Sequence, residues 1–177
     1  MEQLSVGDAR LELTVGDITL QDTDTVVNAA NKRLAPGGGV AGAIHRAAGS
    51  ELWEECKELE GCRTGEAKIT RGYHLPASYV IHTVGPVYSG RRCDAELLAA
   101  CYHNALRLAR EYGLSSISFP ALSTGAFGYP LEQAARVSLP AVLDWLEDNG
   151  ELDLVRFVLY DREAYDVHLG VLQSLKR

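Results

Sequence analysis

Two kinds of hydrophobic pattern alternate along this chain. One is a short apolar run rich in β-branched residues, which is typical of strands buried on both faces of a sheet. The other places apolar residues three and four positions apart, which is typical of a helix with one buried face. The first pattern predicts strands at 10–15, 25–30, 79–85, 116–122 and 154–160. The second predicts helices at 40–48, 50–59, 95–113, 130–150 and 162–175.

The order of these elements predicts the fold class. Strands that alternate with helices indicate an α/β protein with a largely parallel sheet. Residues 66–73 are less apolar and predict an edge or half-exposed strand. Pro140 lacks an amide hydrogen and should kink the helix at 130–150. No linker or repeat divides the sequence, so we expect a single domain over residues 1–177.

Charge and composition exclude several classes of function. The net charge is −7, whereas a nucleic-acid surface is normally basic, so nucleic acid is an unlikely partner. No apolar segment reaches the ~20 residues of a membrane span, and the acidic N-terminus does not resemble a signal peptide. The four cysteines lack metal-ligand spacing. We therefore expect reduced thiols, mostly in the core, in a cytoplasmic protein without a metal or cofactor.

Three loops carry candidate chemistry at the edge of the predicted sheet where ligands bind in such folds. They are residues 16–19, the first glycine loop (35–42) and the second glycine loop (122–128). Neither glycine loop contains Lys or Arg, and the P-loop motif is absent. A phosphate bound there would be held by backbone amides and by hydroxyls such as Ser123 and Thr124. The alternative is that both loops are tight turns only.

Five side chains near these loops have a structural and a functional interpretation. Asp17 can cap the turn that follows it, or accept a hydrogen bond from the amino group of adenine. Tyr160 can belong to the core or stack on a base. We expect Asn28 to hydrogen-bond loop backbone, and Asn31 to hold a sugar hydroxyl nearer the mouth of the site. We expect a structural role for His45.

Five segments of the sequence together carry a family resemblance. "GDIT", "VVNAANKRLAPGGGVAGAIHRAAG", "GEAKITRGYHLPASYVIHTVGPVY", "FPALSTGAFGYP" and "LYDREAYD" occur in the order and spacing of the macro domain family. The chain resembles that family from about residue 12 to its last predicted helix. The resemblance implies a three-layer α/β/α sandwich with a mixed, largely parallel central sheet. It also implies that the ligand is ADP-ribose.

The resemblance further implies a role for individual residues. Asp17 and the backbone of Ile18 would bind adenine, with Tyr160 beside the ring. Asn31 would contact the distal ribose. The remaining ligand-binding positions belong to the first and second glycine loops, near the diphosphate and distal ribose: Gly37, Gly38, Gly39, Val40, Ser123, Thr124, Gly125, Ala126 and Phe127.

Ala41 separates a binding function from a catalytic one. Many relatives of the MacroD-type and O-acetyl-ADP-ribose deacetylase branch are hydrolases of ADP-ribosylated proteins or O-acetyl-ADP-ribose, and commonly have aspartate after GGGV. This chain has Ala41 there. We expect a hydrolase in which the ligand's own diphosphate assists water activation, with Asn31 as the catalytic residue. The alternative is a non-catalytic module that binds ADP-ribose or ADP-ribosylated proteins.

Overall fold

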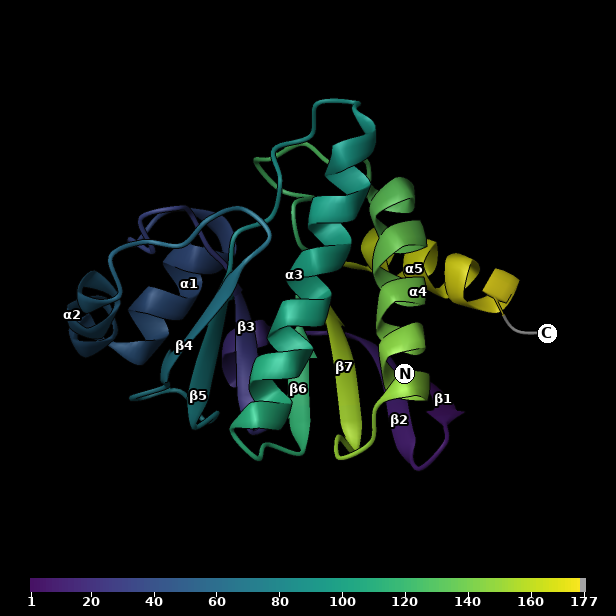
Figure 1. Cartoon of the computed structure of the whole chain (residues 1–177), viewed down its shortest axis with the longest axis horizontal. Coiled ribbons are helices and arrows are strands. Elements are labelled where there is room, and N and C mark those ends of the chain that lie inside the picture. Colours follow the sequence, from purple (N-terminus) through teal and green to yellow (C-terminus); the bar gives the residue numbers. More distant parts are fainter. Residues whose placement is uncertain (176–177) are drawn as a thin grey trace.

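The computed structural model describes residues 1–175 as a seven-stranded mixed sheet with helices on both faces (Figure 1). The strands are β1 (Glu2–Val6), β2 (Ala9–Val15), β3 (Thr25–Ala29), β4 (Ala67–Arg71), β5 (Tyr79–Thr83), β6 (Ser116–Phe119) and β7 (Leu154–Leu159). The helices are the short 3-10 helix η1 (Ile18–Leu20), α1 (Gly39–Ala48), α2 (Ser50–Glu58), α3 (Arg92–Glu111), α4 (Leu131–Asp148) and α5 (Arg162–Leu175). This architecture confirms the predicted α/β/α sandwich.

The spatial order of the strands is β1-β2-β7-β6-β3-β5-β4. The five central strands pair in parallel, while β1 and β4 pair antiparallel at the two edges. β4 is thus the predicted edge strand. The pattern did not predict β1, whose residues alternate between half-buried and exposed and so lack an apolar run. β1 joins β2 through a two-residue hairpin turn in which Gly7 has a φ of +60°.

Neighbouring residues of the central strands pack into two different cores. Val27 and Ile81 face the core beneath α3, α4 and α5, whereas Val26 and Val80 face the core beneath α1 and α2. Side chains alternate between the faces of a strand, so both faces of these strands are apolar and buried. This two-sided burial explains why the strands are uninterrupted apolar runs in the sequence.

The helices lie close to their predicted positions. α4 runs through Pro140 as one helix, and α3 begins three residues earlier than predicted. Among the helices of the described residues, none combines the length and apolar character needed to cross a bilayer.

An aromatic cluster stabilises the larger core. The ring of Phe157 stacks with those of Tyr102 and Phe119, at centroid distances of 5.8 and 5.9 Å. Phe157 is fully buried. Its removal would lose dispersion contacts and leave a cavity between β7 and α3.

We expect Phe157→Ala to lower the free energy of unfolding by about 3–5 kcal/mol, measured by urea denaturation. Leu20→Ala is the control, because Leu20 is 70% exposed and should change stability by less than about 0.5 kcal/mol. Equal stability losses in the two variants would contradict this description of the core.

Candidate functional site

Parallel pairing brings the carboxyl ends of β2, β7, β6, β3 and β5 to one edge of the sheet, at the top of Figure 1. The loops that follow these strands include 16–19, both glycine loops, and the short segment that begins at Tyr160. The sheet therefore gathers every predicted site residue along one edge. This edge is where ligands bind in open α/β sheets.

The first glycine loop leads directly into α1. Gly39 has a φ of +53°, and a Cβ at Gly42 would lie 2.3 Å from the Gly37 carbonyl oxygen, so the fold itself requires glycine at 39 and 42. Gly37 and Gly38 have neither constraint. Gly38 precedes α1 without a side-chain cap, and the amides of the first helical turn have no partners within the helix. Val40 packs its side chain against the smaller core.

Asn31 holds the conformation of this loop. Its Oδ1 accepts hydrogen bonds from the amides of Arg33 and Ala35 at 3.1 and 3.0 Å, and its Nδ2 donates to the Ala35 carbonyl at 2.9 Å. The prediction that Asn28 would bond loop backbone is wrong. Asn28 lies within β3, where its Nδ2 is 3.0 Å from Nδ1 of His82 on the neighbouring strand. The register of β3 directs the Asn28 side chain into the interior, and this register cannot be seen in the sequence.

The second glycine loop is attached to the segment after β5. The Tyr88 amide donates to the Phe127 carbonyl at 2.8 Å, and the Gly128 amide donates to the Gly125 carbonyl at 3.0 Å. The Thr124 hydroxyl donates to the Ala121 carbonyl at 2.8 Å. Gly125 is exposed, and a Cβ there would meet no atom within 4 Å.

Ser123 in this loop has a left-handed backbone, with φ of +68°. Its hydroxyl is buried and has no hydrogen-bond partner among the described residues. The hydroxyl faces Gly85, where an added Cβ would come within 2.1 Å of it. Ala126, three residues further on, is exposed. In this conformation, the exposed backbone of the loop is accessible to a ligand and the Ser123 hydroxyl is not.

Asp17 and Tyr160 follow the adjacent strands β2 and β7, which pair through Val15 and Leu159. Asp17 caps η1, since its Oδ1 accepts hydrogen bonds from the amide and hydroxyl of Thr19 at 2.9 and 2.7 Å. Tyr160 is 92% exposed, which excludes the interpretation of this ring as a core residue. The side chain of Ile18 is buried, so only its backbone can face a ligand.

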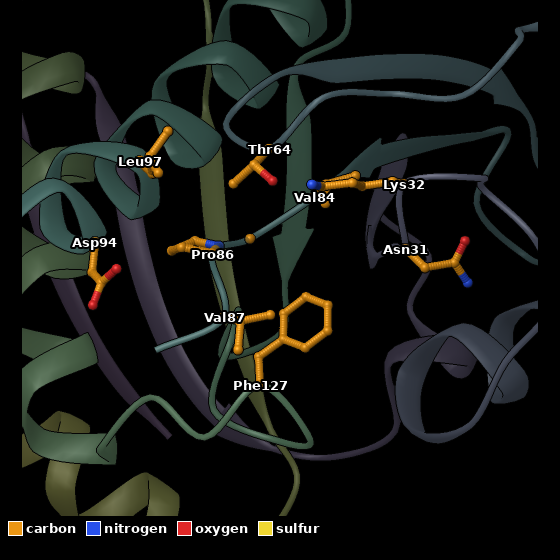
Figure 2. A pocket seen from close by; sticks show the side chains of 10 residues that line it. Asn31, Lys32, Thr64, Val84, Pro86, Val87, Asp94, Leu97 and Phe127 are labelled. Atoms are coloured by element: carbon orange, nitrogen blue, oxygen red, sulfur yellow. The ribbon is translucent and has the colours of Figure 1, made fainter. Parts of the chain in front are cut away.

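A cavity of about 500 Å³ opens at the same edge (Figure 2). Two predicted site residues, Asn31 and Phe127, line it together with residues that the sequence interpretation missed: Lys32, Thr64, Val84, Gly85, Pro86, Val87, Asp94 and Leu97. Figure 2 shows Phe127 beside Val87, with Asp94 and Leu97 to their left, Thr64 above them, and Lys32 and Asn31 to their right. The segment 84–87 follows β5, so the rule for strand ends could have found it.

Asp94 is the acidic residue that lines this cavity. Its carboxylate accepts hydrogen bonds from the amides of Ser89 and Gly90 and from the Ser89 hydroxyl, at 2.8–2.9 Å. The hydrogen bond from the Ser89 amide is the main cause of the lowered pKa of the Asp94 carboxyl. A carboxylate with a lowered pKa and occupied oxygens is a weak base. Asp94 therefore organises the start of α3.

Beneath the first glycine loop lies a buried cluster of polar side chains. His82 is fully buried, with Nε2 2.9 Å from the Thr70 hydroxyl. Burial is the main cause that lowers the pKa of His82 to about 3, and the electrostatic effect of nearby His45 is the second cause. Burial also lowers the pKa of His45, whose ring nitrogens have no hydrogen-bond partner among the described residues. Ala41 is buried one turn before His45 on the same face of α1.

The cysteines do not form a reactive or metal-binding site within the described residues. All four are free, and Cys56, Cys62 and Cys101 are buried, whereas Cys93 is exposed. Burial is the main cause that raises the pKa of the Cys56 thiol to about 12 and that of Cys62 to about 11. Across residues 1–175, no group of three or more His, Cys, Asp and Glu side chains is placed to hold a metal ion.

Comparison with known proteins defines the class. The family model described as Macro domain matches residues 27–138, which is more than half of the chain. The chain therefore belongs to the macro domain family, and the resemblance seen in the sequence is confirmed. The MacroD-type branch is consistent with the curated relatives described next.

The individual relatives are similar over most of this chain. A macro domain-containing protein of Methanosarcina mazei is 53% identical over 156 residues, which cover 88% of this chain and 83% of that protein. The ADP-ribose glycohydrolase MACROD1 of Mus musculus is 53% identical over 142 residues, which cover 79% of this chain and 44% of that protein.

Solved structures share the whole fold. The Oceanobacillus iheyensis macrodomain with ADP is 44% identical and superimposes with a TM-score of 0.95, covering 98% of this chain and 95% of that chain. A mutant of the same macrodomain with ADPR gives a TM-score of 0.95 at 43% identity, covering 98% and 97%.

The buried histidines predict how stability depends on pH. The unfolded chain binds a proton on His82 near the ordinary pKa of 6.5, but the folded protein does so only near pH 3. Between these values the unfolded state binds more protons, so stability falls as the pH is lowered, by up to about 1.4 kcal/mol per pH unit for this residue. The lowered pKa values of His45 and His168 act in the same direction.

We expect urea denaturation to show lower stability at about pH 5 than at about pH 7, with a shallower decline for His82→Gln. Because this substitution also removes hydrogen bonds to Asn28 and Thr70, the change of stability with pH is compared, not its absolute value. An identical decline in the variant and the wild type would show that His82 does not cause the pH dependence.

Proposed function

We propose that this chain binds ADP-ribose along the carboxyl edge of its sheet. The observation that carries the proposal is the pair of glycine loops without cationic side chains, in which Gly37, Gly38 and Gly125 are not required by contacts within the fold. Side chains are missing where a ligand would need to approach the backbone. Backbone amides at a helix N-terminus suit a diphosphate. Solved relatives with ADP and ADPR support this choice of ligand.

The two ends of the proposed ligand have different environments. At one end, Asp17 has a second carboxylate oxygen to accept the adenine amino group, and the exposed ring of Tyr160 can stack on adenine. At the other end, Asn31 and Phe127 line the cavity and would contact the distal ribose. The first and second glycine loops lie between these two ends. A ligand bound in this orientation would have the reactive carbon of its distal ribose at the cavity.

Calorimetry with ADP-ribose tests the binding proposal. We expect one site per chain, and at least about tenfold weaker affinity for Gly125→Val, because the added side chain would occupy the space of the diphosphate. A Cβ at Gly125 meets no protein atom, so the melting temperature of the variant should be unchanged. The control is Gly150→Val, away from this edge in the turn between α4 and β7, where an added Cβ also meets no atom within 4 Å. Absence of heat with the wild-type chain would refute binding.

We further propose that the chain hydrolyses ADP-ribose conjugates, either ADP-ribosylated proteins or O-acetyl-ADP-ribose. Water would attack the distal ribose carbon and release the acyl group as its carboxylate, or attack the acyl carbon and release the ribose as its alcohol. The ligand's diphosphate would orient the water or take its proton. In the attack on the acyl carbon, this proton passes to the departing ribose oxygen. Asn31 would position the distal ribose for this step. The support is the similarity to the glycohydrolases MACROD1 and MACROD2 of Mus musculus, at 53% and 50% identity.

Substrate assistance is proposed because, among the described residues of the cavity and the predicted site, no carboxylate is free for this role. Ala41 stands where the resemblance leads us to expect an aspartate. Asp94 is occupied by hydrogen bonds, and Asp17 lies at the proposed adenine end. Loss of a general base typically costs about 10²–10⁴-fold in rate. Ala41 therefore also favours a second candidate function, a module that binds ADP-ribose without turnover.

Turnover of O-acetyl-ADP-ribose and of a glutamyl-ADP-ribosylated protein separates these two functions. We expect slow turnover by the wild-type chain and about tenfold or faster turnover by Ala41→Asp, if a missing base limits the rate. Asn31→Ala should lower the rate more than it weakens ADP-ribose affinity. Stoichiometric binding without product in all assays would favour the binding module. Equal losses of rate and affinity in Asn31→Ala would limit Asn31 to binding.

A further inference from the structure

Several exposed cations lie on the segments that supply lining residues of the cavity, although the chain as a whole is acidic. Five exposed cations, Lys32, Arg33, Arg63, Arg91 and Arg92, form what we term the cationic rim. They come from three separate segments of a chain whose net charge is −7.

Contacts along the backbone attach these segments to the cavity. Lys32 lines the cavity itself, and its carbonyl accepts a hydrogen bond from the Cys62 amide at 2.8 Å, which places Arg63 beside it. The Arg91 carbonyl accepts from the amide of Asp94, another lining residue, at 3.1 Å. The rim residues therefore belong to three segments that supply lining residues of the cavity: the segment after β3, the segment before β4, and the start of α3.

No described carboxylate forms a direct ion pair with the cationic rim. Within residues 1–175, none of its five side chains makes an ion pair or a side-chain hydrogen bond. Other arginines are paired, as Arg107 is with Glu111 and Arg162 with Asp166. Four carboxylates lie on or next to the same segments, but within residues 1–175 none forms an ion pair with the cationic rim: Glu60, Glu66, Asp94 and Glu96.

We propose that the cavity and its cationic rim are the docking surface for the polypeptide that carries the ADP-ribose, and that they select acidic sequence around the modified side chain. This inference rests on the proposed function, because the distal ribose must point toward Asn31 and Phe127. The polypeptide attached to the distal ribose would then enter the cavity. Its aliphatic parts meet apolar walls from Val84, Pro86 and Leu97, and its carboxylates meet the rim.

A peptide suits this surface better than a nucleic acid does. Binding of single-stranded nucleic acid combines cationic groups with several aromatic rings that stack on bases. Of the described residues that line the cavity, Phe127 alone is aromatic. The walls are mainly aliphatic, and the charges stand at the rim, where they remain hydrated and can exchange water for carboxylates.

The experiment compares two peptides in which one ADP-ribose is attached through a non-hydrolysable linkage. One peptide has Asp and Glu on both sides of the modified position, and the other has Ser and Gln. We expect calorimetry to show about three- to tenfold tighter binding of the acidic peptide, since each exposed charge pair adds only a small gain and several would act together. This advantage should shrink at about 0.5 M salt. Free ADP-ribose serves as the reference ligand.

Charge-reversal variants test whether the cationic rim causes the preference for the acidic peptide. Arg63→Glu/Arg91→Glu should abolish or invert the preference for the acidic peptide and leave the affinity for free ADP-ribose unchanged. The control is Arg71→Glu/Arg107→Glu, with the same change in net charge. Arg71 ends β4 beside the start of β5, on the opposite edge of the sheet, and Arg107 lies about 22 Å along α3 from Arg92. We expect this control to keep the wild-type preference.

The possible failures are distinct. If the wild-type chain does not bind free ADP-ribose, the proposed function is refuted together with this inference. If ADP-ribose binds but the two peptides bind equally, or both double variants lose the preference alike, only the docking surface is refuted. If Arg63→Glu/Arg91→Glu loses binding to a single-stranded RNA and keeps the peptide preference, the rim serves nucleic acid instead.

Discussion

The parallel pairing of five strands is the constraint on which the rest of this structure depends. It aligns the strand ends, so Asp17 and Tyr160, near opposite ends of the chain, follow neighbouring strands. Such pairing requires strands that are buried on both faces. Here α1 and α2 cover one face, and α3, α4 and α5 cover the other. The candidate site is therefore built from loops whose ends are anchored in two packed cores.

Recognition at this edge relies mainly on backbone groups. An acidic chain can hold a dianion only where its own carboxylates are kept away or neutralised, and backbone amides provide positive dipoles without side-chain charge. Gly39 and Gly42 serve the fold of the first glycine loop, while Gly37, Gly38 and Gly125 leave space outside it. The same loop is held in shape by Asn31, so one residue links the structure of the loop to the proposed ribose contact.

The proposed functions assign binding, chemistry and partner selection to different groups. Amides would bind the diphosphate, the cavity would receive whatever is attached to the distal ribose, and the cationic rim stands outside both. Ala41 leaves the buried face of α1 without a carboxylate, and Asp94 has its oxygens occupied by the start of α3. Binding therefore depends on features that the fold supplies directly. The proposed turnover would depend on the ligand's own phosphates.

The sequence by itself determined the family, the central strands and the helices, because apolar periodicity records which faces are buried. It also predicted the edge along which the candidate ligand residues lie. β1 escaped prediction because its residues are only half-buried. Only the tertiary structure decided that Asn31 supports the loop while Asn28 faces His82, since strand register sets the direction of a side chain. Likewise, Lys32, Thr64 and Leu97 form one cavity wall only because the loop before β4 and the helix α3 pack beside the end of β5.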